Sequence, residues 1–144
     1  MTGSSLTPGQ IDARARTIFR YGGCSALAIA LHDATRWPIL AVTDSHNVDE
    51  GRTGGGSALH WGVRHPSGMF LDIEGLHRDE DLIEEYEGEA DDGEAAVGIA
   101  ARADAMEWYG NGTVSSTISL ALAGTFVAPL FEIVASDKPD QRSS

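Results

Sequence analysis

Cys24 is the first residue whose type and setting could support covalent chemistry. It is the only cysteine in the chain, it follows Gly22 and Gly23, and it opens a predicted helix. The positive end of the helix dipole and the unpaired backbone N–H groups there favour the thiolate, which is the reactive form of a cysteine. The backbone N–H of Cys24 can also donate to an oxyanion. The local pattern is equally compatible with a small, buried and inert thiol.

His60 and Asp72 form the second chemical candidate, because a predicted β-hairpin brings them together. The hairpin covers residues 58–64 and 69–75, and Pro66-Ser67-Gly68 fits a three-residue loop that ends in a left-handed glycine. In that register Asp72 lies opposite Gly62 and on a short diagonal from His60. A carboxylate there can hold one imidazole nitrogen while the other faces a nucleophile.

The same hairpin allows other interpretations of these residues. Its register gives one apolar face and one mixed face, so a half-exposed strand with a polar outer face is the plain alternative. The apolar face holds Leu59, Trp61, Val63, Leu71 and Ile73. The mixed face holds His60, Gly62, Arg64, Phe70, Asp72 and Glu74. Glu74, directly opposite His60, is a rival for orienting the imidazole.

A metal site is a weaker possibility for the histidines. The ligands would be His46, His60, Asp72 and His77, but their spacing matches no known ligand pattern. The sequence therefore implies neither a metal nor a cofactor. The glycine-rich loop 53–57 lacks the Gly-Lys-Ser/Thr ending of a phosphate-binding loop, so a nucleotide site is not expected either.

The N-terminal half predicts two helices and a strand that would position Cys24. Thr7, Pro8 and Gln10 resemble a helix start with a capping box, and the apolar spacing continues to about Tyr21. The second helix is expected over 24–34. A short buried strand is expected over 39–42, followed by a long polar loop over 44–57.

The C-terminal half predicts mainly helices. A short acidic helix is expected over 80–86, and a longer helix over 94–109. The apolar segment that follows is expected to form helices, with Pro129 near the start of the last one. The uncharged stretch 113–131 contains several Ser and Thr residues, a glycine and a proline, which favours a buried core segment over a membrane span.

Length and charge limit the class of protein. The chain has 144 residues, a formal charge of −12 and 42% hydrophobic residues, which predicts one domain over 1–136 and a polar tail over 137–144. Ten acids and no base lie between residues 79 and 94, so the remaining chain is almost neutral. This balance argues against direct binding to nucleic acid or to an anionic membrane.

Cysteine and arginine usage suggest the compartment. A single cysteine allows no internal disulfide, and residues 1–10 contain neither the basic nor the apolar region of a secretory signal. Arginine outnumbers lysine nine to one, which is typical of GC-rich bacterial or phage genes. We therefore expect an acidic cytoplasmic protein of a bacterial or phage-infected cell.

Several sequence motifs of this chain resemble those of a known family. The motifs that carry the resemblance are Gly23-Cys24-Ser25-Ala26-Leu27-Ala28-Ile29-Ala30-Leu31, then Trp37-Pro38-Ile39, then His60 three residues before Val63, then Gly68 and Leu71-Asp72-Ile73-Glu74-Gly75. Over residues 20–77 the chain looks like small, mostly uncharacterised bacterial and phage proteins of the papain-like cysteine-hydrolase fold. The resemblance implies an α+β fold, with the nucleophile on a helix N-terminus packed against a small antiparallel sheet, and with C-terminal helices.

The resemblance also implies a function. A Cys24-His60-Asp72 catalytic triad would act on an amide, ester or isopeptide bond of a protein or peptide substrate, as a thiol protease, a deamidase or a transglutaminase-like acyltransferase. Such enzymes commonly carry a glutamine shortly before the nucleophile as a second oxyanion donor. Residues 20–23 are Arg-Tyr-Gly-Gly here, and Gln10 lies too far back, so that role is unassigned.

A function of a different class fits the acidic segment. Residues 79–94 could occupy a basic groove of a partner protein, as a phage-encoded inhibitor without catalysis would do. The plain alternative is a solvated helix face and loop. A degenerate hydrolase kept as a structural component is a third possibility.

Overall fold

The structure is a computed structural model that describes residues 6–21, 23–53, 58–90, 93–111 and 118–136. Its α-helices are α1 (Ala13–Tyr21), α2 (Cys24–Thr35), α3 (Asp79–Tyr86), α4 (Arg102–Asn111), α5 (Leu120–Gly124) and α6 (Val127–Ser136). Its strands are β1 (Ile39–Asp44), β2 (His60–Arg64), β3 (Phe70–Asp72), β4 (Gly75–His77) and β5 (Ala95–Ala100). Two short 3₁₀ helices, η1 (Ser45–Asn47) and η2 (Glu87–Glu89), complete the described elements.

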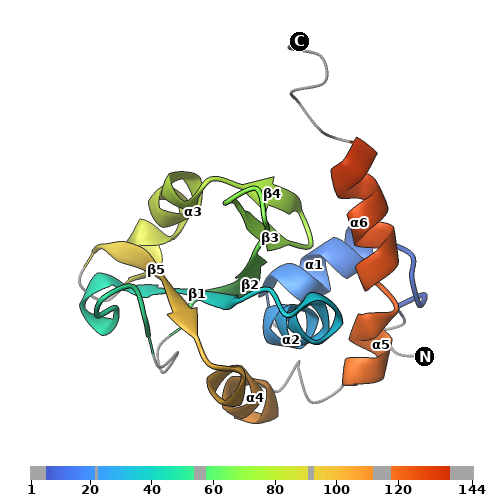
Figure 1. Ribbon diagram of the computed structural model, residues 1–144, viewed down its shortest axis with the longest axis horizontal. Helices are drawn as coiled ribbons and strands as arrows, with labels where there is room; N and C mark the ends of the chain where they lie inside the picture. Colours follow the sequence, from blue (N-terminus) through green and yellow to red (C-terminus); the bar gives the residue numbers. More distant parts are fainter. Residues whose placement is uncertain (1–5, 22, 54–57, 91–92, 112–117, 137–144) are drawn as a thin grey trace.

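The fold is α+β, and its strands form one antiparallel sheet in the order β4-β3-β2-β1-β5. Helices cover both faces. Figure 1 shows α3 on one side of the sheet and α2 with α4 on the other. The predicted α+β class is therefore confirmed.

Two hydrophobic clusters occupy the two faces of the sheet. The cluster beside α2 takes alternate residues of the central strands, among them Ile39, Trp61 and Val63. The cluster beside α3 takes the intervening residues, among them Leu40 and Phe70. The strand face that carries His60 is thus covered by α3, and the alternative of a polar outer face is wrong.

The hairpin has the register that its turn chemistry predicts. Val63 lies opposite Leu71, and Arg64 opposite Phe70. The backbone N–H of His65 donates to the Met69 carbonyl at 2.9 Å, and Gly68 has a left-handed φ of +92°. The face assignment holds for the strands themselves, but Leu59, which precedes β2, packs with the cluster beside α3.

The second strand of the hairpin is shorter than predicted. β3 ends at Asp72, and the chain turns back so that β4 pairs with it, with Leu71 opposite Leu76. The reversal makes Glu74 an exposed turn residue that forms an ion pair with Arg20. The rival role of Glu74 as the group that orients His60 is therefore wrong.

The predicted helix over 94–109 is half wrong, because residues 95–100 form β5. The alanine-rich sequence suits a helix, but pairing along the whole of β1 outweighs this local preference. The other edge of β5 is also satisfied, since Thr53 N–H donates to the Ile99 carbonyl and Ile99 N–H donates to the Gly51 carbonyl. Gly98 leaves space there, because a Cβ at this position would lie 3.3 Å from the side chain of Thr53.

The first helix starts later than predicted. Thr7 and Gln10 form a turn, closed by a 2.9 Å bond from the Gln10 N–H to the Thr7 carbonyl. The Asp12 carboxylate instead accepts from the Ala15 N–H at 2.9 Å, and the helix begins at Ala13. The C-terminal helices are confirmed, with Pro129 in the first turn of α6. The glycine run 54–56 and the tail 137–144 lie outside the described residues.

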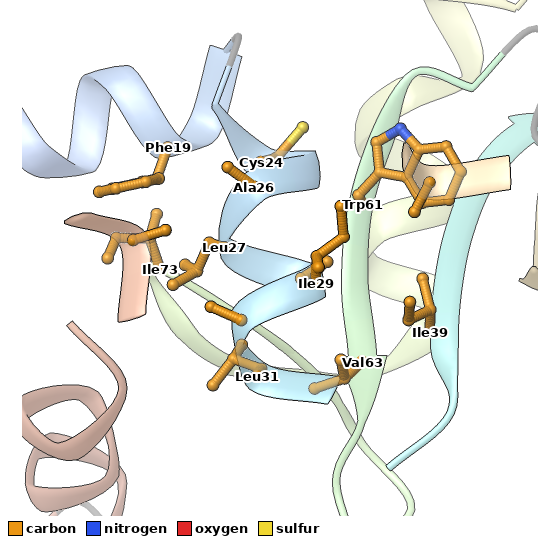
Figure 2. Packing of buried hydrophobic residues seen from close by; sticks show 14 of the residues in the cluster. Phe19, Cys24, Ala26, Leu27, Ile29, Leu31, Ile39, Trp61, Val63 and Ile73 are labelled. Carbon is orange, nitrogen blue, oxygen red and sulfur yellow. The ribbon is translucent and has the colours of Figure 1, made fainter. Parts of the chain in front are cut away.

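Helix α2 is the central support of the candidate site. Every residue from Cys24 to Leu31 is buried, because α1, α4, α5 and the sheet all pack around this helix. Figure 2 shows Leu27, Ile29 and Leu31 along its length, among side chains of the surrounding elements. A helix held on all sides fixes the position of its first residue, Cys24.

Candidate active site

Cys24 is the first residue of α2, and glycine precedes it for a steric reason. The Gly23 N–H donates to the Ile18 carbonyl at 2.8 Å, which joins the end of α1 to the start of α2. A Cβ at Gly23 would lie 3.2 Å from that same carbonyl oxygen and from the ring of Phe19. Cys24 itself is only 6% exposed, and Figure 2 shows its sulfur pointing away from Phe19.

His60 and Asp72 meet as predicted. Nε2 of His60 donates to Oδ2 of Asp72 at 2.7 Å. His60 is the first residue of β2 and Asp72 is the last residue of β3, and the two side chains are 1% and 5% exposed. This buried contact gives the imidazole a fixed orientation.

Two aromatic rings are stacked with the imidazole. The ring of Phe70 is stacked with His60 at a centroid distance of 5.7 Å, and the ring of Tyr86 is stacked with it at 5.5 Å. Phe70 comes from β3 and Tyr86 from the last residue of α3. The role of Tyr86 was not anticipated, and the only signal for it was its place four residues after Leu82 on an amphipathic helix.

Asp72 contacts a second histidine as well. Its Oδ1 accepts from Nε2 of His77 at 2.7 Å and from the Glu74 backbone N–H at 2.8 Å. Burial would raise the pKa of Asp72, but hydrogen bonds from His60 and His77 lower it to about 2. The carboxylate therefore stays ionised. The sequence placed His77 only among possible metal ligands, and its bond to Asp72 was missed because it depends on the reversal between β3 and β4.

The electrostatics of His60 connect it to Cys24. Burial alone would lower the pKa of His60. The interactions with Asp72 and with Cys24 outweigh burial and raise this pKa from its ordinary value of 6.5 to about 10. Its second ring nitrogen, Nδ1, is buried and has no hydrogen bond of standard geometry. Cys24 is thus near enough to act on the ring electrostatically, and the nitrogen not used by Asp72 remains available.

Several buried polar atoms without a hydrogen-bond partner belong to His60 or to sequence neighbours of the site residues. In the described part of the chain, three buried side-chain nitrogen or oxygen atoms lack a hydrogen-bond partner: Ser25 Oγ, His60 Nδ1 and Trp61 Nε1. Each belongs to His60 or to a residue that directly follows Cys24 or His60 in the chain. Such atoms are rare in folded proteins, and a catalytic role is one recognised explanation for them.

The remaining histidines do not join this arrangement. Nδ1 of His32 bonds to the Trp37 carbonyl, and Nδ1 of His65 bonds to the Ser67 hydroxyl. His46 lies in η1. Across the described ranges, no group of three or more His, Cys, Asp or Glu side chains is arranged to hold a metal ion. Asp72 and His77 instead bond to each other.

Comparison with known proteins gives no relative from which a role could be transferred. The chain matches no family model, no curated protein and no solved structure. In the described residues, no helix has both the length and the apolarity needed to cross a membrane. The case for a function therefore depends on the geometry around Cys24.

Proposed function

We propose that this protein is a cysteine hydrolase or acyltransferase of papain-like fold that uses Cys24, His60 and Asp72. The observation that carries the proposal is the state of His60. One ring nitrogen bonds to the buried Asp72 carboxylate, the other makes no hydrogen bond of standard geometry, and the interaction with Cys24 helps to raise the pKa of the ring to about 10. An inert buried thiol would require none of this arrangement.

The first chemical step follows from the charges. In the proposed mechanism the thiol proton of Cys24 has passed to Nδ1 of His60, so the sulfur reacts as a thiolate. The sulfur attacks the carbonyl carbon of an amide or ester, and the electron pair of the C=O bond moves to oxygen. As a residue of the first turn of α2, Cys24 has a backbone N–H without an intrahelical acceptor, and this group can donate to that oxygen.

The later steps return the enzyme to its starting state. The oxyanion collapses, the bond to the leaving group breaks, and that group takes the proton from Nδ1 of His60. The neutral imidazole then accepts a proton from water, which attacks the thioester carbonyl and releases the acid. If an amine attacks in place of water, the product is a transferred acyl group.

The proposed substrate is a protein or peptide that contains an amide, ester or isopeptide bond. Peptidase, deamidase and acyl-transfer activity share these steps. The proposed setting is the cytoplasm of a bacterial or phage-infected cell. The proposed scheme assigns no role to a cofactor.

Some residues of the acidic segment form ion pairs within the fold. Asp79 forms a bidentate ion pair with Arg64 at 2.7 and 3.0 Å, and Glu85 pairs with Arg20. Part of the charge of residues 79–94 is therefore neutralised internally. Binding of a basic protein to this segment stays a prediction.

Alkylation of Cys24 tests the proposal. Iodoacetamide is small, which suits a thiol of low exposure, and its rate with the protein is compared with that of a free model thiol. We expect faster alkylation in the protein, and loss of that advantage in His60→Gln. Mass spectrometry locates the label, and thermal unfolding checks that the variant is folded. A rate no faster than the model thiol, or a Cys24→Ala protein with full hydrolytic activity, would refute the triad.

A further inference from the structure

Trp61 carries a polar atom whose lack of a partner needs an explanation. Its indole N–H is a donor only, the residue is 1% exposed, and Nε1 has no acceptor. Leaving a buried donor unsatisfied is costly, because the group gives up its bond to water and gains none in return. An acceptor that arrives with the substrate would remove this cost during the reaction.

The position of Trp61 in the same cluster as Cys24 indicates that the acceptor is part of the group that Cys24 attacks. Trp61 follows His60 on β2 and belongs to the same hydrophobic cluster as Cys24. Figure 2 shows the Trp61 nitrogen and the Cys24 sulfur at the same end of the layer between α2 and the sheet. Trp108 of α4 lies against the Trp61 ring at a centroid distance of 6.2 Å, and this contact restrains the indole.

We propose that the Trp61 indole N–H is the second oxyanion donor of the site. The inference rests on the proposed function. The acceptor is the carbonyl oxygen of the acyl group attacked by Cys24, as negative charge develops on it. The Cys24 backbone N–H is the other donor. Because β2 carries both His60 and Trp61, one strand supplies the general base and the oxyanion donor.

The proposed step is balanced within the site and the substrate. Attack by sulfur forms the S–C bond while the C=O π electrons move to oxygen, and Trp61 donates a hydrogen bond without losing its proton. On collapse the C=O bond is restored, and the leaving group departs with the proton from His60. The indole therefore stabilises charge and undergoes no net change.

Two reactions of the Cys24 sulfur distinguish oxyanion stabilisation by Trp61 from a purely structural role of this residue. Acylation by p-nitrophenyl acetate passes through an oxyanion, whereas alkylation by iodoacetamide is a displacement at carbon that forms none. In Trp61→Phe we expect the acylation rate to fall about 10²-fold, as for loss of one oxyanion donor, while alkylation is unchanged. Trp108→Phe, which removes the neighbouring indole N–H but keeps an aromatic ring against Trp61, should keep both rates.

A second replacement controls for shape. Substitution of Trp61 by 3-benzothienylalanine replaces the ring N–H by sulfur and preserves the size of the ring, so it should fold even if the phenylalanine variant does not. The same selective loss of acylation is expected. Ser25→Ala removes the hydroxyl of α2 that is the other unpartnered side-chain donor besides Trp61, and it tests the rival assignment.

The outcomes are distinct. Equal losses in acylation and alkylation would give Trp61 a purely structural role, and unchanged acylation would exclude it as a donor. A selective loss in Ser25→Ala, with none at Trp61, would assign the donor to the serine. Each of these results overturns the inference. If wild-type Cys24 reacts no faster than a model thiol with either reagent, the proposed function itself fails.

Discussion

His60 and Asp72 are joined at 2.7 Å through Nε2 and Oδ2, so the imidazole has one nitrogen engaged and one without a hydrogen bond of standard geometry. The contact is buried, with side-chain exposures of 1% and 5%. Water therefore competes little with the carboxylate for the ring. The orientation of His60 then depends on this bond and on the two aromatic rings stacked with it.

Asp72→Asn should disable the site without changing its shape. Asparagine fits the same space but lacks the negative charge that keeps the pKa of His60 raised. We expect acylation by p-nitrophenyl acetate to fall about 10²- to 10⁴-fold, the range for loss of acid–base catalysis. Stability should fall by about 2 kcal/mol, because bonds to a charged acceptor are lost. Urea unfolding and burst kinetics measure the two effects, and an unchanged acylation rate would contradict the role of Asp72.

His77 should act as a positioning residue through Asp72. His77→Leu removes one of three donors to the carboxylate, so we expect about a tenfold slower acylation, equivalent to about 1.4 kcal/mol. His77→Gln retains an N–H donor and should restore most of the rate. A defect of equal size in both variants would indicate that His77 contributes only packing. NMR titration of the His60 ring gives an independent readout, since its pKa should fall in His77→Leu only if Asp72 moves.

The lowered pKa of Asp72 predicts a loss of stability in acid. Its folded-state pKa of about 2 lies below the ordinary value of 3.8, so the contribution is complete above about pH 4 and is lost as the pH falls toward 2. The difference in unfolding free energy between wild type and Asp72→Asn should shrink over this range, by up to about 1.4 kcal/mol per pH unit. Urea titrations at several pH values measure it. A difference that stays constant across the range would show that Asp72 is not held ionised.

Gly62→Ala should disturb the stack around His60. A Cβ at this position would lie 2.3 Å from Cε1 of Phe70 and 2.5 Å from the Leu71 carbonyl oxygen. Relief of that overlap requires both the Phe70 ring and the backbone of β3 to shift, at a cost of about 1–3 kcal/mol. Thermal unfolding and near-ultraviolet circular dichroism report both effects. Gly88→Ala is the matched control, because no atom lies within 4 Å of its Cβ position, and it should change stability by less than about 0.5 kcal/mol.

Neutralising the acidic segment should leave the chemistry of Cys24 intact. Glu80, Glu84, Glu87 and Glu89 are exposed, and none of them contacts the triad. With all four changed to glutamine, alkylation and acylation rates should match wild type. Loss of binding to a basic protein in the same variant would support the partner interface, whereas loss of Cys24 reactivity would show that the segment belongs to the site.

Prediction from the sequence succeeded where local rules decide the structure. The contact between His60 and Asp72 follows from the loop that ends at Gly68, because turn type sets the register of a hairpin. The start of α2 at Cys24 follows from the glycines before it. Both are short-range features that a few neighbouring residues determine.

The errors arose where distant segments compete. Residues 95–100 have helical composition, yet β1 offers a full set of antiparallel partners and the strand wins. His77 reaches Asp72 only because the chain reverses after β3, and Tyr86 reaches His60 only because α3 packs on the sheet. Single-residue patterns carry no information on such pairings.

The turn at residues 65–69 limits how this chain can vary. Exposed loops of many proteins gain and lose residues freely, but successive side chains of a strand point to opposite faces. An insertion of one residue beside Gly68 would redirect Asp72 toward the layer occupied by α2 and bring Leu71 to the imidazole. Active relatives should therefore conserve the length of this distant loop as strictly as they conserve the cysteine.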